Sequence, residues 1–406
     1  MQERVSYFFP KNFYWGCASS SHQIEGNTYN DWSEWEKSEE RVGELKRQNK
    51  DPREYISGSA ANSFILNNQD IACLKELNVN AYRFSIEWSR IEPEQGSFDY
   101  EALKNYQNFI LKLKANNIEP FVTLWHWPIP IWVRDLGGWQ SKKILPFFDR
   151  YVKIVAEFLD KNVDYWVTLN EPTVYASNSY LTGQWPPQKK SLFLSLKVIK
   201  NLIRAHKSAY AVLKNIDTNN QIGIASHNIN FDPAGKKVFN KVVAGLANYF
   251  WNEYFLNKIS GEQDFVGLNY YFHNLINYGF GKNENKLISD MGWELYPEGV
   301  KHVIKGLDKY KKPIYILEHG LADKDDKHRA WYLKESLKNI HEAIASGSDV
   351  RDYFHWSLLD NFEWADGFFP RFGLYEVNYK TFERTPRSAV KTYSEICREN
   401  GFKNDN

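Results

Sequence analysis

Short β-prone runs alternate with longer amphipathic stretches along almost the whole chain, and this alternation limits the possible folds more than any other feature. The runs are rich in β-branched and aromatic residues, as strands of a buried sheet are. The stretches between them place apolar residues at steps of three and four, the spacing of one face of a helix. The eight predicted strands are 13–20, 80–88, 119–127, 164–171, 221–229, 264–272, 313–321 and 352–358.

The order of strands and helices favours a closed parallel barrel over an open, doubly wound sheet. The chain contains no GxGxxG, GxxxxGK or GxSxG motif, so the glycine-rich loops and the nucleophile elbow of many open α/β sheets are missing. A barrel of this kind can exceed the usual size of one domain. We therefore expect a single (β/α)8 TIM barrel that spans residues 1–406 as one catalytic domain.

The charge balance argues against two classes of partner. The chain has 51 basic and 50 acidic residues, a formal net charge of +1. Binding to nucleic acid or to an acidic membrane needs a clustered basic surface. We expect neither partner.

The cysteines and the apolar segments further narrow the class of protein to which the chain can belong. Cys17, Cys73 and Cys397 show neither the spacing of a metal site nor a disulfide framework. We expect no metal and no cofactor. The first 16 residues lack the pattern of a signal peptide, and no apolar run approaches the roughly 18–20 residues that span a bilayer. A cytoplasmic protein is the expectation.

Candidate site residues lie where the predicted strands end, because barrels of this class carry their chemistry at the C-terminal ends of the strands. Glu171 ends the fourth strand and Glu318 the seventh, so their side chains should face each other across the mouth. Many other polar and aromatic residues gather at the same ends. They include Gln23, His126, Trp127, Asn170, Asn269, Tyr271 and Trp356.

Two carboxylates in a pocket walled by aromatic residues fit glycoside hydrolysis. One must be ionised to attack the anomeric carbon, and the other must be protonated to assist the leaving oxygen. Arg83 and Tyr271 could keep one carboxylate ionised, and Asn170 could donate a hydrogen bond to a sugar 2-hydroxyl. The alternative is a buried ion-pair network of Arg83 with Glu171 or Glu318 that has no catalytic role.

Several motifs, in the same order along nearly the whole chain, resemble those of glycoside hydrolase family 1. The segment TLNEP (168–172) resembles the acid/base motif, and ILEHG (316–320) resembles the nucleophile motif. The resemblance implies a retaining β-glycosidase that hydrolyses β-D-glucosides, and also galactosides or fucosides, through a covalent glycosyl-enzyme. Further matching segments are 19–26, 82–91, 122–130, 267–272, 291–297 and 354–374.

The resemblance also implies a role for each matching residue. Glu171 would be the general acid/base and Glu318 the nucleophile, with their carboxyl groups roughly 5–5.5 Å apart. Arg83, Asn269 and Tyr271 would support these carboxylates. The implied substrate-binding residues are Gln23, His126, Trp127, Asn170, Trp293, Trp356, Glu363, Trp364 and Phe372. The carboxylate of Glu363 suits neutral sugar hydroxyls and would repel a 6-phosphate.

The sequence departs from the family pattern in three places. Leu317 and His319 replace the usual Thr and Asn, and strand alternation should point both away from the face of Glu318. His319 is therefore predicted to pack behind the nucleophile. Pro128 replaces a usual Asp, which should change the hydrogen bonds of its loop. The segments 183–191 and 251–261 are altered or short, so we expect a differently built leaving-group side.

Three functions remain open from the sequence. A transglycosylase, which passes the sugar to another sugar, would use the same residues as a hydrolase. A carbohydrate-binding barrel without catalysis should have lost a carboxylate or its supports, but all of them are present. In each case the expected partner is a small carbohydrate, a β-glycoside or a short oligosaccharide. The sequence does not predict the oligomeric state.

Overall fold

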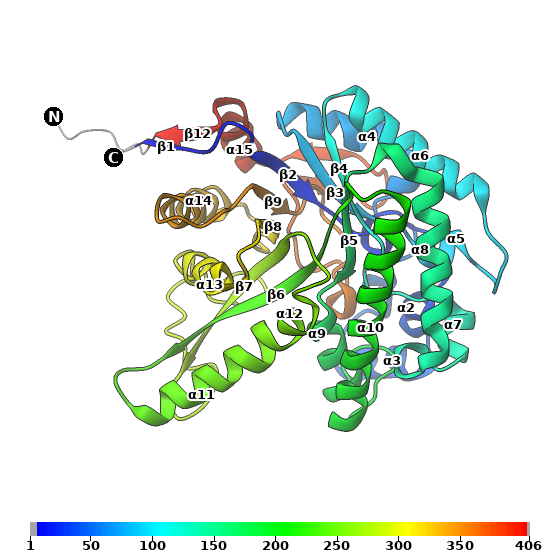
Figure 1. Cartoon of the computed structure of the whole chain (residues 1–406), viewed down its shortest axis with the longest axis horizontal. Helices are drawn as coiled ribbons and strands as arrows, with labels where there is room; N and C mark the ends of the chain where they lie inside the picture. The colour runs from blue at the N-terminus through cyan, green and yellow to red at the C-terminus, as the bar shows by residue number, and fades with distance from the viewer. Residues whose placement is uncertain (1–5, 404–406) are drawn as a thin grey trace.

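Eight parallel strands close into a barrel in the computed structural model, which describes residues 6–403 (Figure 1). Each strand pairs with the next along the chain, and β2 also pairs with β9, so this sheet has no free edge. The predicted strands and the (β/α)8 barrel are confirmed. The barrel strands are β2 (Tyr14–Ala18), β3 (Ala81–Ser85), β4 (Glu119–Thr123), β5 (Tyr165–Asn170), β6 (Gln221–Pro233), β7 (Val266–Ile276), β8 (Ile314–His319) and β9 (Asp352–Trp356).

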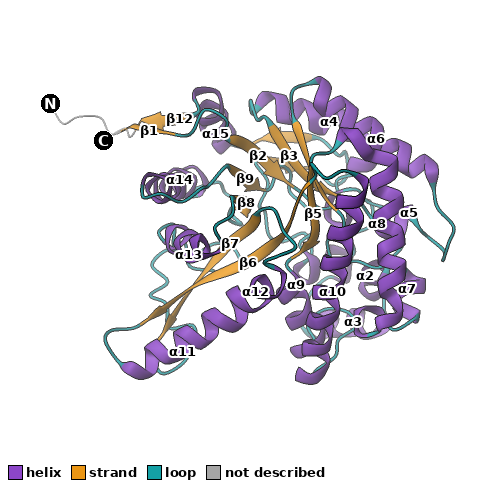
Figure 2. Ribbon diagram, in the orientation of Figure 1, coloured by secondary structure: helices purple, strands orange, loops and turns teal. Residues whose placement is uncertain are grey.

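Helices cover the outside of the barrel, as Figure 2 shows by the purple ribbons around the orange strands. The larger helices are α4 (Ser63–Glu76), α6 (Tyr100–Ala115), α8 (Leu145–Leu159), α10 (Leu192–Ile216), α11 (Val238–Asn248), α12 (Tyr254–Ile259), α13 (Gly299–Leu307), α14 (Arg329–Ala345) and α15 (Ser388–Glu399). The loops after β2 to β5 contain α1 (Ser21–Ile24), α2 (Asp31–Glu36), α3 (Glu39–Arg47), α5 (Trp88–Ile91), α7 (Ile131–Asp135) and α9 (Pro172–Ala176).

The spacing of apolar residues explains how the two layers meet. Within each strand the side chains alternate between the interior and the helices. Phe121 in β4 joins the cluster inside the barrel, whereas its neighbour Val122 joins the core between strands and helices. On the helix side, α8 buries residues at steps of three and four, namely Phe148, Tyr151, Val152, Val155, Ala156 and Leu159.

Aromatic rings fill the barrel interior towards the N-terminal ends of its strands. Phe121 and Tyr165 stack with their ring centroids 4.2 Å apart, and Tyr315 and Phe354 pack against Phe121. The interior is therefore a packed core and not a channel. The packing leaves the opposite ends of the strands as the place where a ligand can enter.

Strands β6 and β7 run beyond the barrel, which the sequence did not predict. The predicted runs end at residues 229 and 272, but the two strands stay paired as far as Pro233 and Ile276. In Figure 1 the resulting ribbon extends away from the barrel, beside α11. We call residues 229–233 of β6 and 272–276 of β7 the β6–β7 ribbon.

Two short antiparallel sheets lie outside the barrel. Strand β10 (Tyr375–Val377) pairs with β11 (Arg384–Pro386), and β1 (Ser6–Phe8) pairs with β12 (Gly401–Lys403). Asn400 joins the second pair to the first barrel strand, because its side chain accepts a hydrogen bond from the indole of Trp15 and donates one to the carbonyl of Phe9. The first and last described segments therefore lie side by side, as Figure 1 shows.

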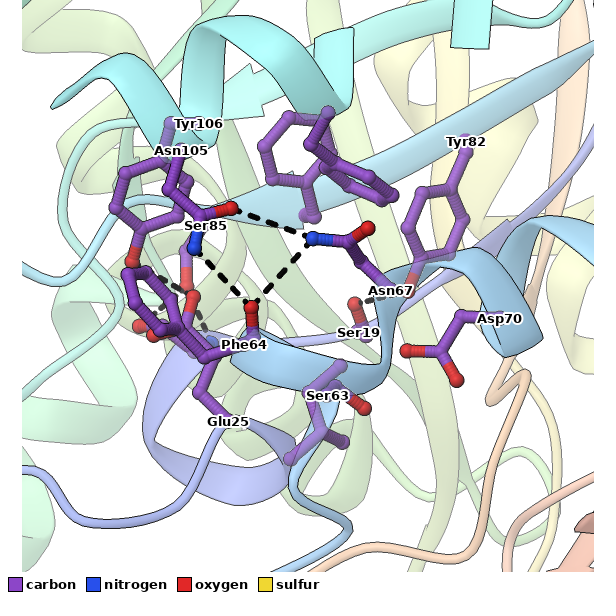
Figure 3. Close-up of a pocket in the computed structure, with 14 residues that line it drawn as sticks. Ser19, Glu25, Ser63, Phe64, Asn67, Asp70, Tyr82, Ser85, Asn105 and Tyr106 are labelled. Atoms are coloured by element: carbon purple, nitrogen blue, oxygen red, sulfur yellow. Dashed lines mark hydrogen bonds between the residues drawn. The ribbon is translucent and has the colours of Figure 1, made fainter. Parts of the chain in front are cut away.

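A small cavity lies between α4, α6, β3 and the segment after β2 (Figure 3). Helix α4 is kinked at Leu66, and the amides of Asn67 and Asn105 both donate to the carbonyl oxygen of Phe64 beside the kink. The cavity has a volume of about 30 Å³, enough for a water molecule but far too small for a sugar.

No helix within residues 6–403 combines the length and the apolar content that crossing a membrane requires.

Candidate active site

A cavity of about 490 Å³ opens at the C-terminal ends of the barrel strands. Its size is that of a pocket for a small organic ligand. Glu171 from the end of β5 and Glu318 from β8 both line it, together with many of the residues proposed from the sequence. These other residues are His126, Trp127, Tyr271, Trp293, Trp356, Glu363, Trp364 and Phe372.

The four remaining residues of the predicted site are fully buried next to the cavity. Each of them bonds to a side chain that lines the cavity. Arg83 bonds to Glu318, Asn170 to His126, Asn269 to Glu171 and Gln23 to Glu363. The structure thus brings all the predicted site residues together, with one set facing the cavity and a second set holding it.

Glu318 is held by two donors. An Arg83 nitrogen lies 2.6 Å from Oε1, and the Tyr271 hydroxyl donates to Oε2 at 3.0 Å. The Arg83 side chain is completely buried and also donates to the carbonyl oxygen of Leu317, to the Thr123 hydroxyl and to the Asn170 amide oxygen. Burial raises the pKa of Glu318 above its usual value, and Arg83 and then Tyr271 offset part of this rise. These donors favour the ionised form.

The contacts of Asn170 fix the orientation of its amide and the tautomer of His126. Arg83 can only donate, so the oxygen of the Asn170 amide faces Arg83 at 2.7 Å and the nitrogen faces His126 at 2.9 Å. His126 Nε2 must then accept, which leaves the proton of the neutral ring on Nδ1. Burial and the charge of Arg83 push the pKa of His126 far below its usual value. The buried Nδ1 has no hydrogen-bond partner among residues 6–403, so its N–H is free for a ligand.

Glu171 lies in a different environment from Glu318. It accepts a hydrogen bond of 2.8 Å from the Asn269 amide, and the cations of the site do not contact it directly. Burial and then the negative charge of Glu318 raise its pKa to about 8. At neutral pH Glu171 is therefore the protonated member of the pair, and Glu318 is the member stabilised as an anion.

Three residues that line the cavity have left-handed backbone conformations. The φ angles are 86° at Trp127, 41° at Glu171 and 52° at Trp364. For residues other than glycine this conformation costs roughly 1 kcal/mol or more. Glu171 is followed by Pro172 at the start of α9, and its amide donates to the carbonyl of Ala225 in the next strand. Packing of the barrel therefore holds the turn that aims Glu171 into the cavity.

One side of the cavity is a cluster of stacked rings. Trp364 packs against Trp127 with centroids 4.5 Å apart, and it lies nearly parallel to the His126 ring at 5.9 Å. Beside them, Gln23 donates to Glu363 at 3.2 Å. Burial and then the neighbouring carboxylates raise the pKa of Glu363 well above its usual value. Flat rings next to carboxyl and imidazole groups suit a sugar, which has an apolar face and a hydroxylated rim.

His319 packs away from the cavity, as predicted. Its ring is completely buried between the rings of Tyr332 and Tyr270, and Nδ1 lies 3.2 Å from the Tyr353 hydroxyl. Burial lowers its pKa to about 3, so the ring is neutral. Gly320 follows, and any side chain there would clash with the carbonyl oxygen of Trp356.

The prediction for Leu317 was wrong. Leu317 belongs to the cluster inside the barrel, on the same side as Glu318, although the two residues are adjacent. The register between β7 and β8 shifts between Leu268 and Asn269, so that Leu268 pairs with Ile316 and Asn269 with Glu318. This irregularity breaks the simple alternation of a strand and lets two consecutive side chains point inwards.

Sequence reasoning missed most of the opposite wall of the cavity. This wall contains the apolar side chains of Val174, Ile229, Trp251, Phe272 and Met291, with Asn178, Gln184, His227 and Asn274. Trp185, which was also missed, packs on Trp127 among the stacked rings, with centroids 4.5 Å apart. Trp251 is oriented by a hydrogen bond of 3.2 Å from its indole to His227. The sequence signals were indirect. Gln184, Trp185 and Trp251 fall in the segments 183–191 and 251–261 that differ from the family pattern, and Phe272 and Met291 fall in the matching segments 267–272 and 291–297.

The described residues contain no group of three or more His, Cys, Asp or Glu side chains placed to hold a metal ion.

An eight-stranded parallel barrel with two carboxyl groups of unequal pKa in an aromatic pocket at its mouth defines a glycoside hydrolase. The comparisons with known proteins agree. The model of glycosyl hydrolase family 1 matches residues 5–259 and 251–402. The chain belongs to this family.

Relatives match over nearly their whole length. Beta-glucosidase A of Thermotoga maritima is 33% identical, over 97% of this chain and 98% of its own. The beta-glycosidase from Pyrococcus horikoshii is 38% identical, with a TM-score of 0.90 over 98% of this chain and 97% of that one. The Thermotoga maritima beta-glucosidase in complex with deoxynojirimycin is 31% identical, with a TM-score of 0.90 over 98% of this chain and all of its own.

Proposed function

We propose that the chain is a retaining β-glycosidase that hydrolyses β-D-glucosides, and also galactosides or fucosides, by double displacement. The observation that carries the proposal is the unequal support of the two carboxyl groups. Arg83 and Tyr271 stabilise Glu318 as an anion, whereas burial and the charge of Glu318 raise the pKa of Glu171 to about 8.

In the first step, the Glu318 carboxylate attacks the anomeric carbon while the bond from that carbon to the leaving oxygen breaks. Glu171 gives its proton to the leaving oxygen, and a covalent glycosyl-enzyme forms on Glu318. The charge of Glu318 is lost when the new bond forms. Because that charge helps to raise the pKa of Glu171, the pKa of Glu171 then falls.

In the second step, the ionised Glu171 takes a proton from a water molecule. The water oxygen attacks the anomeric carbon and displaces Glu318 as a carboxylate, so that Glu171 is protonated again and the configuration of the sugar is retained. A distance of roughly 5–5.5 Å between the two carboxyl groups would suit this mechanism, and it remains a prediction.

The sugar that is transferred would bind among the stacked rings. We propose that Trp356 supports its face and that Gln23, His126, Asn170, Glu363 and Trp364 bind its hydroxyls. The free N–H of His126 supports this role, because it is a buried donor without a partner among the described residues. The second N–H of Asn170 could bind the 2-hydroxyl. Asn269 would position Glu171, with which it already shares a hydrogen bond.

The leaving group would lie against Trp293 and the apolar wall. Val174, Ile229, Phe272 and Met291 give this wall an apolar surface, while Asn178, Gln184 and Asn274 on the same wall offer hydrogen bonds. We therefore propose leaving groups that have an apolar face, and hydrolysis over transfer to sugar acceptors. The single catalytic domain of residues 1–406 and the cytoplasmic location remain predictions from the sequence.

The test is incubation with a panel of aryl β-glycosides, followed by trapping with a 2-deoxy-2-fluoro-β-glycoside and mass spectrometry of the peptides. We expect turnover and a label on the peptide that contains Glu318. Turnover with a label on another peptide would refute the nucleophile assignment. If no glycoside is turned over, a carbohydrate-binding role without catalysis replaces the proposal.

A further inference from the structure

The leaving-group side of the cavity is formed in part by a segment that lies outside the strands of the barrel. Residues 285–297 belong to the connection (277–298) between the end of the β6–β7 ribbon and α13, and Trp293 in this segment lines the cavity. The Trp293 ring packs against Phe272 of the ribbon with centroids 4.4 Å apart. Backbone hydrogen bonds within the segment fold it into a narrow turn, in which the Ser289 amide donates to the carbonyl of Trp293.

The residues that follow Phe272 and Trp293 in the chain also contact each other, on the face turned away from the cavity. His273 follows Phe272, and Glu294 follows Trp293. The His273 Nδ1 lies 2.5 Å from Glu294 Oε2, and its Nε2 lies 3.0 Å from Asp232 Oδ2 on the neighbouring strand. The imidazole is only 7% exposed and stacks on the Tyr296 ring, with centroids 3.9 Å apart. We call His273, Asp232 and Glu294 the imidazole clamp.

Only a protonated imidazole satisfies this arrangement. Both ring nitrogens face a carboxylate, and a neutral ring has a single N–H. Loss of the proton would turn a lone pair towards one of the two anions. Burial disfavours the charged ring, but the hydrogen bonds to Asp232 and Glu294 outweigh it and raise the pKa of His273. Reciprocally, the bond to His273 lowers the pKa of Asp232.

Other charged and titratable groups around the clamp come from the connection 277–298 and from the helices α13 and α14. They are Glu284 and Lys286 before Trp293, Tyr296 after it, Glu298 and His302 at α13, and Glu335 on α14. Asn283 adds a fixed contact, because its amide donates to the His273 carbonyl and accepts from the Leu275 amide. Within the described residues around the ring, only Asp232 and Glu294 bond to the imidazole itself.

We propose that His273 is a positioning residue for leaving-group recognition: the imidazole clamp fixes residues 285–297 on the β6–β7 ribbon and so holds Trp293 in the wall of the cavity. The proposal rests on the proposed glycosidase function. The clamp acts on the leaving group, because the Trp293 ring packs on Phe272 of the ribbon and not on Trp127 or Trp364 of the stacked rings, where the transferred sugar would bind. It also opens when the pH rises past the point at which His273 loses its proton.

The experiment compares the chain with its His273→Gln and Glu294→Gln variants, and with His302→Gln as a control for a nearby histidine outside the clamp. Two substrates separate the two sides of the cavity. 4-Nitrophenyl β-D-glucoside has a leaving group that reaches Trp293, whereas 2-deoxy-2-fluoro-β-D-glucosyl fluoride, which traps the nucleophile, releases only fluoride. Both are measured from pH 5 to pH 9.

We expect His273→Gln and Glu294→Gln to raise KM for the nitrophenyl glucoside about five- to tenfold near pH 6, with kcat changed less than twofold. In the unaltered chain KM should rise at alkaline pH, and in His273→Gln it should be high throughout. The trapping rate with the fluoride and all constants of His302→Gln should not change. The proposal is overturned if KM follows the same pH profile with and without His273, or if both substrates lose activity equally.

Hydrogen–deuterium exchange tests whether the clamp holds residues 285–297, and it does not depend on catalytic activity. At the same pH, the amides of residues 285–297 should exchange faster in His273→Gln than in the unaltered chain. Equal exchange refutes the clamp, even if the protein is a glycosidase. Faster exchange in a chain that turns over no glycoside refutes the proposed function and leaves the clamp as a feature of the structure.

Discussion

Arg83 is the residue whose loss tests the separation of roles between the two carboxyl groups most directly. It is fully buried and makes the only direct ion pair that the described residues give to Glu318, at 2.6 Å. The substitution Arg83→Met keeps most of the volume and removes the charge and every donor. It takes one donor from Glu318, which keeps Tyr271, and one from each of the oxygens of Asn170, Thr123 and Leu317.

The magnitude follows from these contacts. Removing one member of a buried ion pair costs about 3–5 kcal/mol of unfolding free energy, and the three other acceptors push the cost towards the upper end. An opposite charge in contact lowers the pKa of a carboxyl group by about 1–3 units. Without Arg83, the pKa of Glu318, already raised by burial, should rise by about that amount.

The sign of the pH dependence is fixed by this rise. In Arg83→Met the folded state binds the proton of Glu318 more tightly than the unfolded chain, whose Glu titrates near its ordinary value of 4.5. The stability of the variant therefore falls as the pH rises above that value, by about 1.4 kcal/mol per pH unit, up to the new pKa of Glu318. The loss of stability should be smaller at pH 5 than at pH 8.

Two measurements check this reasoning. Guanidinium unfolding at both pH values gives the loss of stability, and kcat/KM for an aryl β-glucoside against pH should show the acid limb moved upwards by about 1–3 units. The matched control is Arg384→Met, which breaks another buried pair, with Asp70 at 3.0 Å, away from the cavity. It should lose stability without moving the acid limb. An unmoved acid limb in Arg83→Met would refute the role of Arg83.

Three further predictions follow from the same site. Because the pKa of Glu171 is about 8, kcat/KM for an alkyl β-glucoside should fall about tenfold per pH unit above pH 8, and a flat profile to pH 9.5 would contradict the acid assignment. Glu363→Ala should lower kcat/KM for a β-glucoside at least tenfold. The loss should be smaller for a β-xyloside, which lacks the 6-hydroxyl, and equal losses for the two substrates would disprove the contact between Glu363 and the 6-hydroxyl. His319→Phe should keep kcat/KM within twofold. It should lower the unfolding free energy by about 1 kcal/mol, because the contact with Tyr353 is lost. A large loss of activity would show that the imidazole changes the pKa or position of Glu318.

The barrel and most of the candidate site could be predicted from the sequence because both depend on local patterns. Strand periodicity located the eight strands, and the rule that barrel chemistry lies at strand ends selected Glu171 and Glu318. His319 could be placed behind the nucleophile by alternation alone. The same rule failed for Leu317, because the shift of register depends on how β8 pairs with β7 and not on the residues of β8.

The rest of the site depends on contacts between distant segments. The β6–β7 ribbon is polar at Asn230, Asp232 and His273, so its residues do not show the apolar pattern that marks a buried strand. The imidazole clamp joins three segments of the chain, and no motif links their residues. The left-handed turn at Glu171 is also invisible in the sequence, since glutamate does not favour that conformation.

The pairing of β1 with β12 has a consequence for how the chain can be made. Ser6 pairs with Lys403, so the two strands that stand furthest apart in sequence are neighbours in space. Closing a loop of this length costs about 5 kcal/mol of chain entropy, and ribosomal synthesis delivers the second partner last. A short linker between the two strands would remove that cost. A circularly permuted gene with new ends in the exposed turn at residues 279–282 should therefore still yield the closed barrel.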